Sequence, residues 1–383
     1  MNVRRWRQDM RHTGYRQTLA ALSTAVAVVV TAGCRDEITS PEPNGESPVK
    51  SEIYSFEERR IELHNETDNV RRVGTLTIPI GSGPWPTAII LNPSLPTDRD
   101  GTLGPLKFFK DLAEHLSHRG IAALRMDDRS VGESTGDYFQ STLSDFADDA
   151  AQAIEHVKAI DGIDSRRIGL IGLSQGGAVA SIVASRKPSV GFLVLLGSPG
   201  LPFLESAMQQ ADDLGRAYGI PEEQVQISKE SHRKIIRVLR EEGTEADAVE
   251  KITNILIERG DVPNPLSAFL PDDPQEVAEL FTTPWYRSQV SFDPDKYLTR
   301  VRVPTLAITG GLDIILRPDR HLPAIEKALR RAGNKEFVVR TLPAHNHVLQ
   351  LSKTGQIHEQ GELEETFSVE ALTMISEWIG SLQ

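Results

Sequence analysis

Cysteine is almost absent from this chain, because Cys34 is the only one among 383 residues. A single cysteine excludes an internal disulfide. No metal-ligand spacing occurs either, since His345 and His347 alone do not make a zinc site. The sequence also lacks a phosphate-binding glycine loop and a dinucleotide fingerprint. We therefore expect neither a metal nor a cofactor.

A net positive charge is also missing, because the formal charge of the chain is −12. Residues 1–33 contain five arginines and one aspartate, so the remainder carries −16. Nucleic-acid binding needs basic patches, and broad adhesion to anionic lipid needs positive charge. The sequence argues against both.

The first 33 residues have the pattern of a secretory signal, with a basic start and an apolar run from Leu19 to about Ala32. The run is too short to cross a membrane comfortably. Thr31-Ala32-Gly33-Cys34 resembles the bacterial lipobox, although Thr31 stands where leucine is usual. We expect export and membrane attachment only through a lipid on Cys34. Cleavage without lipidation, which would leave a periplasmic or extracellular protein, is the alternative.

Gly172-Leu173-Ser174-Gln175-Gly176 is the most informative stretch of the sequence. The apolar run before it predicts a short buried strand, and the run of small residues after it predicts a helix. A serine on such a sharp turn takes a strained backbone conformation that exposes its hydroxyl, and bulky neighbours would clash with the strand and helix. We predict that Ser174 is a nucleophile.

An acid should follow the serine, and a histidine should follow the acid. Asp313 lies just past the predicted strand 301–311, at the carboxyl end where ligand-facing residues of parallel sheets collect. Its catalytic role is the favoured interpretation. The alternative is that it caps the helix that begins near Arg317.

The predicted strand 337–342 leads into a loop that holds two histidines, His345 and His347. His347 is the better candidate, because it directly precedes Val348-Leu349 and would be held by packing, and His345 is the alternative. His347 would take the Ser174 proton and return it to the leaving group, and Asp313 would orient the imidazole. Activity should then fall when acid protonates the histidine.

An oxyanion needs backbone N–H donors. One should be Gln175, the residue after the nucleophile, and the other should come from the loop after the strand 87–91. Pro93 in that loop has no N–H. The second donor is therefore Ser94 or Leu95, and the sequence leaves this choice open.

Strands and helices alternate along most of the chain, which predicts a mainly parallel central sheet with helices on both faces. We assign residues 51–200 and 298–383 to this core and residues 34–50, rich in Pro, Glu and Ser, to a flexible tether. Residues 201–297 have helical periodicity and no convincing strand, and the clearest predicted helices are residues 231–241 and 245–259. We expect them to form a helical cap over the site; an insertion remote from the site is the alternative.

Several motifs together resemble one family, the bacterial α/β-hydrolases described as exported or lipoprotein serine esterases. They are Asp98-Arg99-Asp100, Asp127-Asp128-Arg129, the serine turn, Pro284-Trp285-Tyr286 and Asn346-His347 with the tail after it. The likeness covers most of residues 70–380. It implies an α/β-hydrolase fold, a triad of Ser174, Asp313 and His347, and cleavage of a small carboxylic ester through an acyl-enzyme.

The sequence departs from this family beside the serine, where Leu173 replaces the usual histidine. The loop Asn92-Pro93-Ser94-Leu95 replaces a glycine-rich one, which puts the oxyanion geometry and the substrate preference in doubt. Asp127, Asp128 and Arg129 are expected to brace loops. A thioesterase or peptidase with the same triad remains open, as does a non-catalytic surface protein with this fold. Nothing indicates an oligomeric state.

Overall fold

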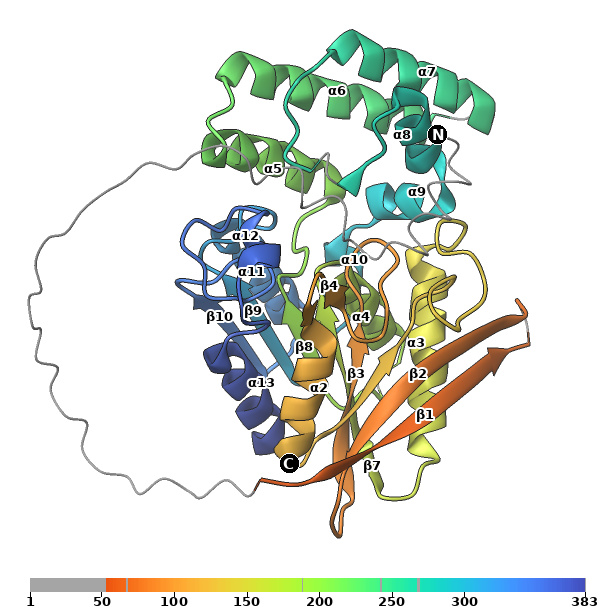
Figure 1. Ribbon diagram of the computed structural model, residues 1–383, viewed down its shortest axis with the longest axis vertical. Coiled ribbons are helices and arrows are strands. Elements are labelled where there is room, and N and C mark those ends of the chain that lie inside the picture. The colour runs from red at the N-terminus through yellow and green to blue at the C-terminus, as the bar shows by residue number, and fades with distance from the viewer. Residues whose placement is uncertain (1–52, 67, 188, 242, 267–268, 383) are drawn as a thin grey trace, which may run out of the picture.

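The computed structural model describes residues 53–66, 68–187, 189–241, 243–266 and 269–382. The predicted signal, Cys34 and the tether lie outside the described residues. The central sheet has eight strands in the order β1-β2-β6-β3-β7-β8-β9-β10 (Figure 1). These strands are β1 (Phe56–Asn65), β2 (Val70–Pro79), β6 (Ala122–Met126), β3 (Trp85–Leu91), β7 (Ile163–Leu173), β8 (Leu193–Leu196), β9 (Thr305–Gly310) and β10 (Phe337–Leu342).

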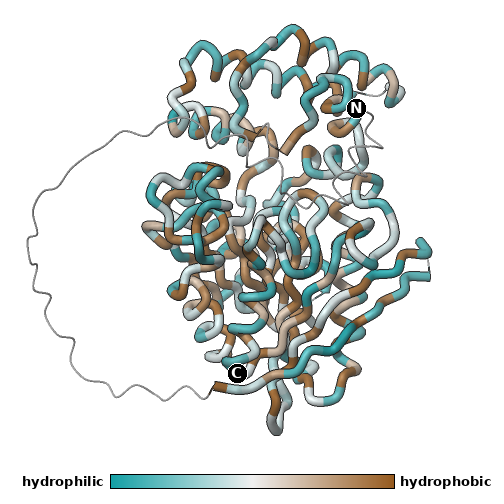
Figure 2. Tube along the Cα trace, viewed as in Figure 1, coloured by the Kyte–Doolittle hydropathy of each residue, from teal (hydrophilic) through white to brown (hydrophobic). Residues whose placement is uncertain are grey.

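The sheet is mainly parallel, as predicted. Strand β2 is antiparallel to both β1 and β6, whereas every pair from β6 to β10 is parallel. Strands β6, β8 and β9 are buried along their whole length, as expected for parallel strands covered on both faces. Strand β1 at the edge is mostly hydrophilic, which Figure 2 shows beside the hydrophobic central strands. Exposed charges on an edge strand disfavour its pairing with a strand of another chain.

Helices cover both faces of the sheet. Apolar side chains of α3, α4, α10 and α11 form a core with one face, and those of α2 and α13 form a core with the other. The bounds are α2 (Phe108–His118), α3 (Leu143–Lys158), α4 (Gln175–Arg186), α10 (Pro294–Leu298), α11 (Pro318–Arg331) and α13 (Val369–Ser381). Strand β7 lies between β3 and β8, so its carboxyl end opens near the middle of the sheet.

Among the described residues, six helices lie between β8 and β9, and the first five pack against one another (Figure 1); we refer to these five as the cap. They are α5 (Phe203–Ala217), α6 (Glu222–Arg240), α7 (Glu245–Arg259), α8 (Pro274–Thr282) and α9 (Pro284–Ser291). Helix α6 begins well before Ser231, where the sequence suggested its start. Side chains of α6 to α9 share an apolar core with Tyr138 and Phe139, which belong to the loop after β6. The cap is therefore packed onto the sheet domain.

Smaller elements complete the described chain. Strands β4 (Thr102–Leu103) and β5 (Leu106–Lys107) form a two-stranded hairpin that the sequence analysis did not predict. A short helix, α12 (Glu359–Glu362), precedes α13. Within the ranges that the structure describes, no helix is both long enough and apolar enough to cross a membrane.

Candidate active site

Ser174 stands on a strained turn between β7 and α4. Its backbone has φ 54° and ψ −118°, a conformation that residues other than glycine rarely adopt. The glycines on either side are required by close contacts. A Cβ on Gly172 would lie 2.3 Å from the backbone of Gly176, and a Cβ on Gly176 would lie 2.3 Å from the carbonyl oxygen of Leu91. The second contact also places the end of β3 against the turn.

Asp313 and His347 are joined by a hydrogen bond of 2.8 Å between Oδ2 and Nδ1. Both are buried, with exposed fractions of 1% and 9%. The other carboxylate oxygen accepts the backbone N–H groups of Ile315 and Leu316, each at 2.8 Å. Helix α11 has Arg317 at its N-cap, so Asp313 orders the turn before the helix and does not cap it. Three bonds fix the carboxylate in place.

The histidine lies beside the serine turn because β7 and β8 are neighbours. The backbone N–H of Ser174 donates to the carbonyl oxygen of Leu196 at 2.8 Å. Gly197 comes next, and a Cβ there would lie 2.9 Å from the His347 carbonyl oxygen and 3.2 Å from Nδ1. Among the described residues the Ser174 hydroxyl has no hydrogen-bond partner. The imidazole and the serine thus share one edge of the sheet, and only the His347–Asp313 half of the predicted triad is hydrogen-bonded.

His345, the alternative base, faces a different element. Its Nε2 lies 2.6 Å from the hydroxyl of Ser368, which caps the N-terminus of α13. Burial lowers the pKa of His345. With its partner on α13, His345 is a structural residue of the loop, and His347 is the one that contacts Asp313.

The carboxylates of Asp127 and Asp128 hold the loop after β3 in place. Asp128 accepts the backbone N–H of Thr97 at 2.9 Å, and Asp127 accepts that of Arg99 at 2.8 Å. Burial raises the pKa of Asp128 to about 7, against the opposing charge of Arg72. Both carboxylates hold the loop that contains Ser94 and Leu95, which is the bracing role expected from the sequence.

The two candidate oxyanion donors of this loop differ in their surroundings. Leu95 has φ 74° and packs, half-buried, against the apolar cluster that contains Tyr138. Ser94 is exposed at the tip of the loop.

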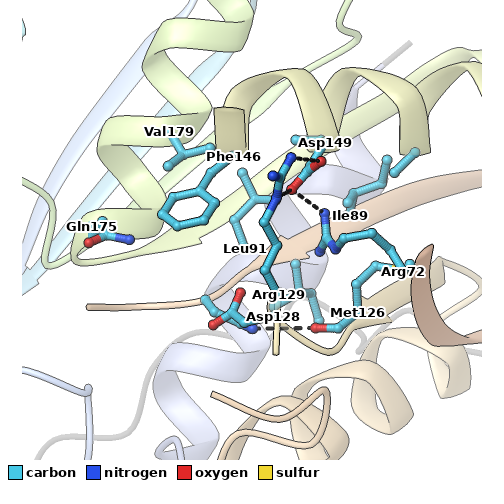
Figure 3. A pocket seen from close by; sticks show the side chains of 14 residues that line it. Arg72, Ile89, Leu91, Met126, Asp128, Arg129, Phe146, Asp149, Gln175 and Val179 are labelled. Carbon is cyan, nitrogen blue, oxygen red and sulfur yellow. Dashed lines mark hydrogen bonds and ion pairs between the residues drawn. The ribbon is translucent and has the colours of Figure 1, made fainter. Parts of the chain in front are cut away.

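Arg129 belongs to a buried ion cluster that lines the pocket shown in Figure 3. Its guanidinium binds both oxygens of Asp149, at 2.8 and 2.9 Å. Arg72 approaches the same carboxylate at 3.1 Å. Asp149 is 2% exposed, so the cluster ties α3 to β2 and to the loop after β6. These charges are paired with one another within the scaffold.

The side chain of Gln175 has a network that the sequence analysis missed. Its Nε2 donates to the hydroxyl oxygen of Tyr138 at 3.0 Å. Its Oε1 accepts the indole N–H of Trp285 at 2.9 Å and the amide of Gln289. Sequence reasoning used only the backbone N–H of Gln175. The one sequence signal at this contact is Trp285, which belongs to the motif Pro284-Trp285-Tyr286 that carries part of the family resemblance.

The burial of His321 on α11 predicts that the stability of the folded protein depends on pH. It is fully buried, and its Nδ1 accepts the backbone N–H of Gly200 at 2.9 Å. Burial lowers its pKa to about 4, although the charge of Asp313 acts in the opposite direction. An unfolded histidine has a pKa of about 6.5. Between pH about 4 and about 6.5, the His321 imidazole is therefore protonated in the unfolded chain but not in the folded chain. The free energy of unfolding thus falls as the pH drops from about 6.5 to about 4.

We expect His321→Gln to flatten this dependence. The wild type should lose about 3 kcal/mol more unfolding free energy between pH 7 and pH 4 than the variant does. Urea unfolding at several pH values measures the difference. His64→Gln, at an exposed position of β1, is the control and should keep the wild-type slope. Parallel curves for wild type and His321→Gln would contradict the prediction.

Comparison by sequence finds similarity to known hydrolases. A family model described as serine aminopeptidase, S33, matches residues 101–217. Esterase EstD of Thermotoga maritima is 32% identical over 185 residues, which cover 48% of this chain and 42% of that protein. The match thus spans less than half of the length of this curated relative.

Solved structures are similar over nearly the whole chain. An esterase of Pyrococcus furiosus superposes with a TM-score of 0.52 at 17% identity and covers 92% of this chain and 99% of its own. The α/β hydrolase GrgF from Penicillium sp. sh18 has a TM-score of 0.52 at 15% identity and covers 85% and 99%. The chain has the α/β-hydrolase fold. By sequence it is similar to a family described as serine aminopeptidase and to a protein named an esterase.

Proposed function

We propose that this protein is a serine hydrolase that cleaves carboxylic esters through an acyl-enzyme. Ser174 is the nucleophile, His347 the base and Asp313 the group that orients the base. One observation carries the proposal: the 2.8 Å bond between His347 and Asp313 lies at the sheet edge where Ser174 occupies its strained turn. A nucleophile, a base and a group that holds the base are the parts that such catalysis needs.

The reaction follows from these positions. His347 accepts the hydroxyl proton through Nε2 while Ser174 Oγ attacks the ester carbonyl. The resulting oxyanion is stabilised by backbone N–H groups. The C–O bond to the alcohol then breaks, and His347 gives its proton to the departing oxygen. A water molecule then attacks the acyl-enzyme in the same way, with His347 as the base. This step releases the carboxylic acid and restores Ser174.

We propose that the loop after β3 supplies the second oxyanion donor, through Ser94 or Leu95, alongside the N–H of Gln175. The supporting observation is that Asp127 and Asp128 hold this loop, and that the end of β3 before it lies against the serine turn. The Ser94 N–H belongs to an exposed residue at the tip of the same loop. Gln175 opens α4, and a helix N-terminus favours negative charge. A negatively charged oxygen above the turn would therefore meet donors from two elements.

A peptidase is the second candidate, because the family model that matches residues 101–217 is described as a serine aminopeptidase. The triad chemistry is the same for esters and amides, since specificity lies in the pocket. We favour esters because the relative with 32% identity is named an esterase.

The test is acylation of the wild-type protein. Mixing with p-nitrophenyl acetate should give a burst of about one p-nitrophenolate per chain followed by slower turnover. A fluorophosphonate probe should label one residue, which peptide mass spectrometry should locate at Ser174. A panel of p-nitrophenyl esters, thioesters and aminoacyl p-nitroanilides then separates the candidates. No burst and no label on Ser174 would overturn the proposal, whereas faster cleavage of the anilides would favour the peptidase.

A further inference from the structure

The side chain of Gln175 is buried and held from two sides. Its exposed fraction is 5%. Two donors from one helix of the cap, Trp285 and Gln289, bond to its Oε1, and Tyr138 from the sheet domain accepts its Nε2–H. The two donors are four residues apart on α9, so they lie on the same face of that helix. Together these bonds tie the residue after the nucleophile to the cap.

We propose that Trp285 is a positioning residue for catalysis, because its indole N–H holds Gln175 and thereby aims the Gln175 backbone N–H at the oxyanion. This inference rests on the proposed function. The backbone at Ser174 is strained, and strain persists only where the surroundings over-determine the conformation. The bonds to the Gln175 side chain supply such a constraint at the adjacent residue. Helix α9 then contributes to catalysis in addition to covering the site.

Trp285 can do this because it is itself firmly held. Its ring is 6% exposed and packs edge-to-face on Phe139, with the ring centroids 5.6 Å apart. Its backbone N–H donates to the carbonyl oxygen of Phe139 at 3.2 Å. Further along α9, the hydroxyl of Ser288 accepts the backbone N–H of Leu143 at 3.1 Å. The helix that presents the indole N–H is thus bonded to the loop after β6 and to the start of α3.

A positioning role predicts a loss in turnover and not in ground-state binding. Removing a whole oxyanion donor costs about 10²- to 10³-fold in kcat. A donor that stays present but is less well aimed should cost less, about tenfold. The affinity for the neutral ester should change little, because the oxyanion exists only in the transition state.

The test is Trp285→Phe, which removes the indole N–H and retains an aromatic ring against Phe139. We expect kcat for p-nitrophenyl acetate to fall about tenfold with KM within about twofold of wild type. The inhibition constant of butylboronic acid, which forms a tetrahedral adduct on the serine, should rise by a similar factor. Tyr286→Phe is the matched control on the same helix. It leaves the indole N–H in place and should keep the wild-type kcat.

A double-mutant cycle shows whether Trp285 acts through Gln175. In a Gln175→Met background, Trp285→Phe should have no further effect on kcat. If Trp285→Phe does not fold, Gln289→Met removes the other donor from α9 and should reduce kcat with KM retained. Unchanged kcat, a loss confined to KM, or additive losses in the cycle would each overturn the inference while the esterase proposal stands. A wild-type protein without turnover or Ser174 labelling would remove both.

Discussion

Ser174→Ala should lower kcat for p-nitrophenyl ester hydrolysis by about six orders of magnitude, to the residual rate that binding and the oxyanion donors provide. The variant keeps the turn but loses the oxygen that forms the acyl-enzyme. Both the burst and the fluorophosphonate label should disappear. Because the strained φ belongs to the turn and not to the hydroxyl, the melting temperature should stay close to that of the wild type.

The control for this variant is Ser185→Ala on α4, whose hydroxyl bonds only within its own helix, to the carbonyl oxygen of Ile182. It should retain the burst and the wild-type kcat. Hydrolysis by Ser174→Ala at a substantial fraction of the wild-type rate would remove Ser174 from the mechanism. Labelling that persists in this variant would point to another nucleophile.

Asp313→Asn should lower kcat by about 10⁴-fold, because the wrong tautomer of His347 would be stabilised. The geometry predicts which way the new amide would turn. Two backbone N–H groups, from Ile315 and Leu316, donate to Oδ1 at 2.8 Å, so the amide oxygen should remain there. The NH₂ group would then face Nδ1 of His347 and force the ring proton onto Nε2, which could no longer accept the serine proton.

Measured kcat and the rate of fluorophosphonate labelling should fall together in Asp313→Asn, because both depend on the same base. Asp319→Asn is the control. That carboxylate lies on the first turn of α11 and is paired with Arg317 at 2.8 Å in an exposed ion pair, so kcat should be unaffected. Wild-type turnover in Asp313→Asn would exclude Asp313 as the orienting acid.

Much of the fold was predictable because its signals are local. The alternation of apolar strands and amphipathic helices follows from side-chain periodicity, and it predicted a mainly parallel sheet with a helical insertion. Helix α7 matches the predicted range of 245–259. The sequence did not predict the start of α6 or the hairpin β4–β5. Strands of two residues carry no periodic signal, and the first turns of α6 are largely polar.

The features of the site also differ in whether local sequence patterns predict them. The glycines around Ser174 follow from a steric rule that involves only adjacent residues, so the sequence revealed the turn. His345 and His347 lie in one loop, and local pattern could only favour one of them. Tertiary structure separates them, because β9 brings Asp313 to His347 and α13 brings Ser368 to His345.

The environment of Gln175 was decided by tertiary structure alone. Its partners lie 37 and 110 residues away in the chain, at Tyr138 and Trp285. Hydrogen bonds between side chains so distant leave no periodicity or spacing in the sequence. They form only when the cap packs against the sheet domain. The sequence thus predicted the strained serine turn and the order of the candidate triad residues, whereas packing of the cap determined what holds the residue after that serine.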